Sequence, residues 1–118
     1  MKTPGPDHPI TVEQHGGRVR VRFGEHVVAD TTAARVLREA SYPPVYYVPR
    51  RDAHMDLLVR STFTTHCPYK GDANYYSVQA DGRTADNAVW TYEQPAPHVA
   101  AIEGHLAFYP DKVSIEVD

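Results

Sequence analysis

The sequence has few of the features that mark membrane, secreted or nucleic-acid-coating proteins. No apolar run approaches the ~18 residues of a membrane-spanning helix, and no signal-peptide core is present, so no membrane association is expected. Only one of the 118 residues is cysteine, which excludes an internal disulfide and favours a reducing, cytoplasmic location. The formal net charge is -3, so general nucleic-acid binding is not expected.

The residues that are abundant suit one small folded domain rich in hydroxyl-bearing aromatic rings. Tyrosine occurs 8 times, against 3 Phe and 1 Trp. Because buried tyrosines need hydrogen-bond partners, a cluster of them is typical of a pocket wall or a hydrated interface. Residues 1–10 hold three prolines and no apolar period, so we expect a flexible N-terminal arm followed by a single β-rich domain at 11–118.

Short alternating segments separated by turn residues predict a mainly β fold. Residues 18–23 alternate arginine with Val19, Val21 and Phe23, which is typical of a half-buried strand. About eight such strands favour a small antiparallel two-sheet sandwich or partly open barrel with one short helix. The apolar spacing at residues 31–40 fits that helix, and an irregular strand is the alternative.

The arginines of the first alternating segment form a row on the face opposite the valines. Arg18, Arg20 and Arg22 would meet an acidic partner or the carboxylates of a second copy, which makes a homodimer possible. The alternative is an ordinary solvated face of the sheet.

The densest set of reactive groups is the loop 66–72, which contains Cys67, Lys70 and Gly71. A nearby cation or base favours the cysteine thiolate, and glycine lets backbone N–H groups turn toward an anion. The loop is therefore a candidate nucleophilic or anion-binding site. In the structural alternative, Cys67 is a small buried side chain and Lys70 makes an ion pair.

A second candidate group begins with Tyr46 and Tyr47, of which one must face inward and the other outward on a strand. An inward tyrosine near Asp52 and Lys70 would form the polar end of an apolar cavity, and Asp52 with Lys70 would serve as an acid–base pair. In the alternative, Asp52 is a turn residue that bonds its own backbone.

A third group lies on two strands that we expect to pair around the Asp81–Gly82 turn. Trp90 and Tyr92 then share a face with only one of Tyr75 and Tyr76. Tyr75 and Trp90 are candidate ligand-binding residues, with core packing as the alternative for Trp90.

No metal or cofactor motif is present in the sequence. The histidines and the cysteine are scattered, without the spacings C-x-x-C or H-E-x-x-H, and no glycine-rich phosphate loop follows a strand. We therefore expect no metal site, and the sequence leaves any cofactor unknown.

Five segments carry a family resemblance: 28–31, 44–52, 67–76, 87–95 and 102–109. In this order and spacing they resemble the bacterial family known as domain of unknown function 427, and Cys-Pro-Tyr-Lys-Gly at 67–71 is the most specific part. The resemblance implies a small, mainly β domain of unestablished activity, also filed under a nucleotidyltransferase label. The residues that it singles out, without roles, are Tyr46, Asp52, Cys67, Lys70, Gly71, Tyr75 and Trp90.

The leading hypothesis is a domain that binds an anionic or nucleotide-like small molecule in a tyrosine-lined cleft near the loop 66–72. Lys70 would supply charge, Gly71 backbone donors, and Tyr46 or Tyr75 a stacking wall. The alternatives are an enzyme, with Cys67 as nucleophile or Asp52 and Lys70 as acid–base pair, and a homo-oligomeric interaction module. The sequence does not decide whether a reaction is catalysed.

Overall fold

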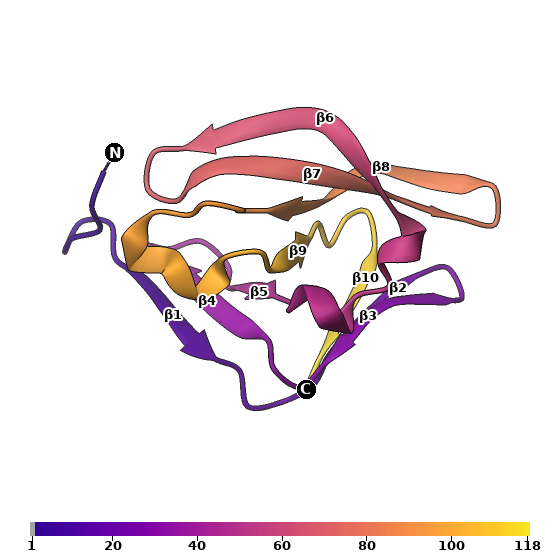
Figure 1. Ribbon diagram of the computed structural model, residues 1–118. Helices are drawn as coiled ribbons and strands as arrows, with labels where there is room; N and C mark the ends of the chain where they lie inside the picture. Colours follow the sequence, from indigo (N-terminus) through magenta and orange to yellow (C-terminus); the bar gives the residue numbers. More distant parts are fainter. Residues whose placement is uncertain (1) are drawn as a thin grey trace.

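Within residues 2–118, which the computed structural model describes, ten strands form three antiparallel sheets with orders β1-β4-β5, β10-β2-β3 and β6-β7-β8-β9 (Figure 1). The strands are β1 (Ile10–Gln14), β2 (Val19–Phe23), β3 (His26–Thr31), β4 (Arg35–Glu39), β5 (Val45–Tyr47), β6 (Leu58–Cys67), β7 (Gly71–Ala80), β8 (Arg83–Thr91), β9 (Leu106–Phe108) and β10 (Ser114–Val117). The 3-10 helices are η1 (Arg50–Asp52), η2 (Met55–Leu57) and η3 (Pro97–Ile102).

The mainly β fold expected from the sequence is confirmed, with its strands in three sheets that do not close into a barrel. The 3-10 helix η3 buries Val99 and Ile102. No helix in residues 2–118 has both the length and the apolar character that crossing a membrane requires.

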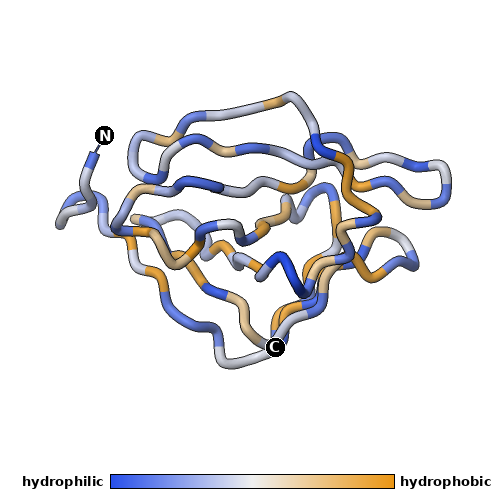
Figure 2. The backbone as a smooth tube through the Cα atoms, in the orientation of Figure 1, coloured by the Kyte–Doolittle hydropathy of each residue, from blue (hydrophilic) through white to orange (hydrophobic). Residues whose placement is uncertain are grey.

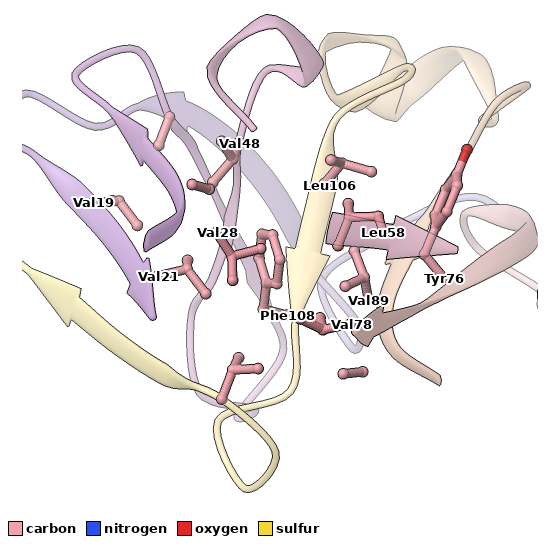
Figure 3. Packing of buried hydrophobic residues seen from close by; sticks show 14 residues of the cluster. Val19, Val21, Val28, Val48, Leu58, Tyr76, Val78, Val89, Leu106 and Phe108 are labelled. Atoms are coloured by element: carbon pink, nitrogen blue, oxygen red, sulfur yellow. The ribbon is translucent and has the colours of Figure 1, made fainter. Parts of the chain in front are cut away.

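Strand β2 forms as its alternating sequence predicts. Val19 and Val21 are 1% and 0% exposed and pack in the first core cluster, and Figure 3 shows the Phe108 ring of β9 beside Val28 in that cluster. Figure 2 shows further hydrophobic residues where β10, β2 and β3 run side by side. The sheet formed by β2 therefore buries one face.

The arginine row of β2 lies on the opposite face and is engaged in ion pairs within the chain. Arg18 and Arg20 both donate to Asp30 of β3, and Arg22 donates to Glu116 of β10 at 2.8 Å. The hydrogen bond from Arg18 is the main reason why the pKa of Asp30 falls to about 2.

The helix expected at residues 31–40 is wrong and the alternative, a strand, is confirmed, because residues 35–39 form β4. It pairs on both sides, with Val12 of β1 opposite Leu37 and Tyr46 of β5 opposite Val36. The two neighbouring strands satisfy its backbone, and the alternation of a strand buries Val36 and Leu37 on opposite faces. Ala40 then takes a positive φ of 48°, which turns the chain into the exposed loop 41–44.

The β7–β8 hairpin turns at Asp81–Gly82, as the sequence predicts. The φ angles of these residues are 55° and 73°, both in the left-handed region that two-residue hairpin turns require. Tyr75 lies directly opposite Trp90 in this hairpin, so Tyr75 and not Tyr76 shares the face of Trp90.

A pair of hydrogen bonds joins the small sheet of β4 and β5 to the four-stranded sheet. Val48 N donates to Leu106 O and Leu106 N donates to Val48 O, both at 2.8 Å. A second core cluster, which includes Leu37, Tyr47, Tyr75 and Tyr92, lies on this side of the molecule. Tyr47 of β5, Tyr75 of β7 and Tyr92, which directly follows β8, therefore lie in one cluster.

Candidate functional site

A cavity of about 200 Å³, here called the tyrosine cavity, opens beside the second core cluster. Its walls combine five tyrosines, one tryptophan, one lysine, one glutamate and three apolar residues. The lining residues are Leu37, Glu39, Tyr42, Pro43, Val45, Tyr47, Lys70, Tyr75, Trp90, Tyr92 and Tyr109.

Three of the residues singled out in the sequence meet at this cavity. Lys70 comes from the turn between β6 and β7, Tyr75 from β7 and Trp90 from β8. The backbone carbonyl of Lys70 accepts a hydrogen bond from Ala96 N at 2.9 Å, which ties the turn to the segment after β8.

Tyr46 lies elsewhere, because its neighbour Tyr47 is the inward residue of the pair. Tyr47 is 1% exposed and lines the tyrosine cavity, whereas Tyr46 lines a neighbouring groove. The sequence required one tyrosine to face each way but gave no means of choosing between them.

Gly71, Cys67 and Asp52 do not line the tyrosine cavity. Gly71 has a φ of 115°, a conformation that favours glycine, so this residue serves the backbone turn into β7. Cys67 is partly buried and packs against the second core cluster.

Asp52 is engaged with a neighbouring strand and is not paired with Lys70. Its carboxylate accepts a hydrogen bond from Thr31 Oγ1 at 2.8 Å, while the carboxylate that pairs with Lys70 is that of Glu39. In residues 2–118, no three His, Cys, Asp or Glu side chains are grouped as a metal site would require.

An ion cluster closes one side of the cavity. Glu39 accepts hydrogen bonds from Lys70 and, at 2.7 Å, from His8 Nε2, and the side chains of Lys70 and Glu39 are 12% and 14% exposed. Burial alone would raise the pKa of Glu39, but the bonds from Lys70 and His8 outweigh it and lower that pKa. Glu39 is therefore ionised and compensated at neutral pH.

His8 and Lys2 both contact the turn between β6 and β7, and His8 also belongs to the ion cluster. The His8 ring stacks on Tyr69 with centroids 3.9 Å apart, and Lys2 N donates to Pro68 O at 2.8 Å. The expected flexibility of residues 1–10 stays a prediction, and Met1 lies outside the described residues.

The aromatic walls are partly joined by hydrogen bonds. Trp90 Nε1 donates to the Tyr47 hydroxyl at 3.2 Å, and the Tyr75 and Tyr109 hydroxyls share a hydrogen bond of 3.2 Å. The Trp90 and Tyr109 rings lie with centroids 4.5 Å apart. These contacts hold the walls of the cavity in place.

Tyr92 differs from the other tyrosines of the cavity. It is 5% exposed, and its hydroxyl takes part in none of the side-chain hydrogen bonds found among residues 2–118. Because no fully buried polar side-chain atom of those residues lacks a partner, this hydroxyl keeps some access to solvent, and Tyr92 lines the cavity. Burial raises the pKa of Tyr47, Tyr92 and Tyr109, so all three phenols keep their protons as possible donors.

A second hollow of about 450 Å³, here called the apolar groove, lies next to the tyrosine cavity. It shares Tyr42, Pro43, Val45 and Trp90 with the cavity. Its other lining residues are Val19, Val21, Pro44, Tyr46, Val48, Phe108, Pro110, Ile115 and Val117.

The fold and its hollows define a small β domain in which strands from three sheets surround a tyrosine-lined cavity and an adjoining apolar groove. The chain belongs to the family described as Domain of unknown function (DUF427), whose model, named NTP_transf_9, matches residues 11–118. This confirms the family resemblance carried by the sequence motifs. None of the curated proteins matches the chain.

Proposed function

We propose that this domain binds a small organic anion in the tyrosine cavity, with Lys70 as the charged partner. The observation that carries this proposal is the excess of hydrogen-bond donors on the cavity walls. Donors without partners call for a ligand rich in acceptors, such as a carboxylate or phosphate group.

Three lining residues have donors to spare. An ammonium group has three N–H donors, and Lys70 uses one of them on Glu39. The Tyr47 hydroxyl accepts from Trp90, which leaves its own proton available, and the Tyr92 hydroxyl has no partner within residues 2–118. A bound anion would receive hydrogen bonds from all three.

Glu39 does not prevent anion binding, because its charge is compensated. Both of its oxygens accept hydrogen bonds, one from Lys70 and the other from His8. Lys70 can therefore bridge Glu39 and a ligand oxygen, and the ligand does not have to displace Glu39.

The volume of the cavity limits the size of the ligand. An engineered apolar cavity of about 150 Å³ holds a benzene molecule, whereas sites for drug-sized ligands start at about 300 Å³. A cavity of about 200 Å³ therefore suits one ring or short chain with its acidic group and is too small for a complete nucleotide.

Binding of benzoate, compared with its neutral isostere benzamide, tests the proposal. At ten times Kd a ligand stabilises the folded state by about 1.4 kcal/mol, which raises Tm by roughly 3–8 °C in a domain of this size. We expect benzoate or phenyl phosphate to raise Tm at about 10 mM and benzamide to have a smaller effect. No shift with either anion, or an equal shift with benzamide, would contradict anion binding.

The catalytic alternatives gain no support from the geometry. Cys67 does not line the cavity, and Asp52 hydrogen-bonds to Thr31 while Lys70 pairs with Glu39. The homo-oligomeric alternative rested on exposed strands and on the arginine row, and the members of that row make ion pairs within the chain.

A further inference from the structure

We infer that the ligand is amphipathic: an acid whose polar group occupies the tyrosine cavity and whose apolar body lies in the apolar groove. This inference rests on the proposed function and names the class of ligand within it, namely medium-chain or aryl-substituted carboxylic acids. The juxtaposition of two hollows of opposite character carries it.

The groove has the composition of a site for hydrocarbon. It is lined by valines, prolines, isoleucine and aromatic rings, and none of its lining residues is charged. Val19, Val21 and Val48 are at most 1% exposed and lie beneath its surface, whereas Val117 and Tyr42 are exposed there. An apolar group in the groove would gain about 25 cal/mol for each Å² of apolar surface removed from water.

The two hollows adjoin and share one wall. Trp90 and Val45 line both, as do Tyr42 and Pro43 of the exposed loop 41–44. A ligand anchored by Lys70 can therefore extend past the Trp90 indole and the loop into the groove without leaving the protein surface.

The volumes of the two hollows suit a ligand with a small polar group in the cavity and a larger apolar body in the groove. The groove measures about 450 Å³ and the cavity about 200 Å³. Sites for small organic ligands fall in the range of about 300–1,000 Å³, a size that the groove supplies and the cavity alone does not.

A series of straight-chain carboxylates from butanoate to octanoate, titrated by isothermal calorimetry, tests the inference. Each methylene that enters the groove is expected to tighten binding by up to about fourfold. A Kd that stays constant along the series would overturn the amphipathic ligand while leaving anion binding in the cavity intact. Absence of binding by every acid, benzoate included, would refute the proposed function as well.

Two valines of similar exposure serve to compare substitutions inside the groove with substitutions elsewhere on the surface. Val117 of β10 lines the groove and is 40% exposed, whereas Val59 of β6 is 45% exposed and lines neither hollow. We expect Val117→Asp to weaken octanoate at least tenfold and to leave butanoate unchanged, with no effect of Val59→Asp on either acid.

The nearly isosteric pair Val117→Thr and Val59→Thr provides the same comparison if an aspartate unfolds the chain. Equal octanoate affinities in the two variants of a pair would overturn the inference. The groove could instead be covered by a second copy of the chain. In that case sedimentation would show a dimer that Val117→Asp dissociates, with no dependence of affinity on chain length, and this result would also overturn the inference.

Discussion

Replacing Tyr92 with phenylalanine separates the stability of the fold from the binding capacity of the cavity. The Tyr92 hydroxyl has no hydrogen-bond partner within residues 2–118, although the side chain is only 5% exposed. Tyr92→Phe therefore removes no intramolecular hydrogen bond and leaves the ring in place. We expect the free energy of unfolding to change by less than about 0.5 kcal/mol.

Tyr76 is the matched control, because it is also 5% exposed but its hydroxyl is engaged. That hydroxyl accepts a hydrogen bond from Arg50 at 3.0 Å and lies 3.5 Å from Arg60 Nη1. Tyr76→Phe should therefore cost about 1.5–3 kcal/mol of stability, the usual contribution of a hydrogen bond that involves a charged group.

For ligand binding we expect the opposite: Tyr92→Phe has the larger effect and Tyr76→Phe the smaller one. A hydrogen bond to a charged ligand contributes about 1.5–3 kcal/mol, so Tyr92→Phe should weaken benzoate binding by about 10-fold to 100-fold. Tyr76→Phe should leave benzoate affinity unchanged, because Tyr76 does not line the tyrosine cavity.

Urea unfolding and calorimetric titration of the two variants measure both effects. A loss of stability in Tyr92→Phe as large as in Tyr76→Phe would show that the Tyr92 hydroxyl already has a partner. Equal benzoate affinities in the two variants would refute its role as a ligand donor.

Three further predictions concern charge and backbone conformation. Arg18 lowers the pKa of Asp30 to about 2, so this ion pair stabilises the fold fully above the unfolded pKa of about 3.9. The stabilisation is lost as the pH falls toward 2. In urea unfolding at several pH values, Asp30→Asn should abolish this part of the pH dependence. Gly71→Ala should lower the free energy of unfolding by about 1–3 kcal/mol, because the φ of 115° is strained for alanine. Gly16→Ala is the control, because a Cβ added there meets nothing within 4 Å. An equal loss of stability in both variants would contradict the strain at Gly71. Lys70→Met leaves the Glu39 carboxylate without its ammonium partner, so its Tm should be lower than that of Lys70→Met combined with Glu39→Leu; the opposite order would contradict the compensated ion pair.

The parts of the fold that depend on neighbouring residues could be predicted from the sequence. The alternation around Val21 placed strand β2, and Asp81–Gly82 placed the turn of the β7–β8 hairpin. The apolar spacing of the segment containing Leu37 fits a helix and a strand equally well, so the sequence alone does not distinguish them. The segment is a strand because it pairs with β1, which lies about 20 residues earlier in the chain, and with β5, which follows it.

The candidate site was predictable only for residues with a local signal. Lys70 stood out because it lies in a turn with cysteine and glycine, and the hairpin register brought Trp90 opposite Tyr75. Glu39 is separated from Lys70 by 31 positions and is the last residue of an ordinary strand, so nothing near it in sequence indicates an ion pair. Tyr92 was identified as sharing the face of Trp90, but its unpartnered hydroxyl depends on the whole arrangement of the walls.

Trp90 stands in the wall that the tyrosine cavity and the apolar groove have in common, and it is the single tryptophan of the sequence. The intrinsic tryptophan fluorescence of the unlabelled protein therefore originates entirely at the candidate site. A ligand in either hollow would alter the surroundings of the indole and with them its emission maximum, quantum yield or access to soluble quenchers. Compound collections can thus be screened optically, without attaching a chemical label to the protein or to the compounds.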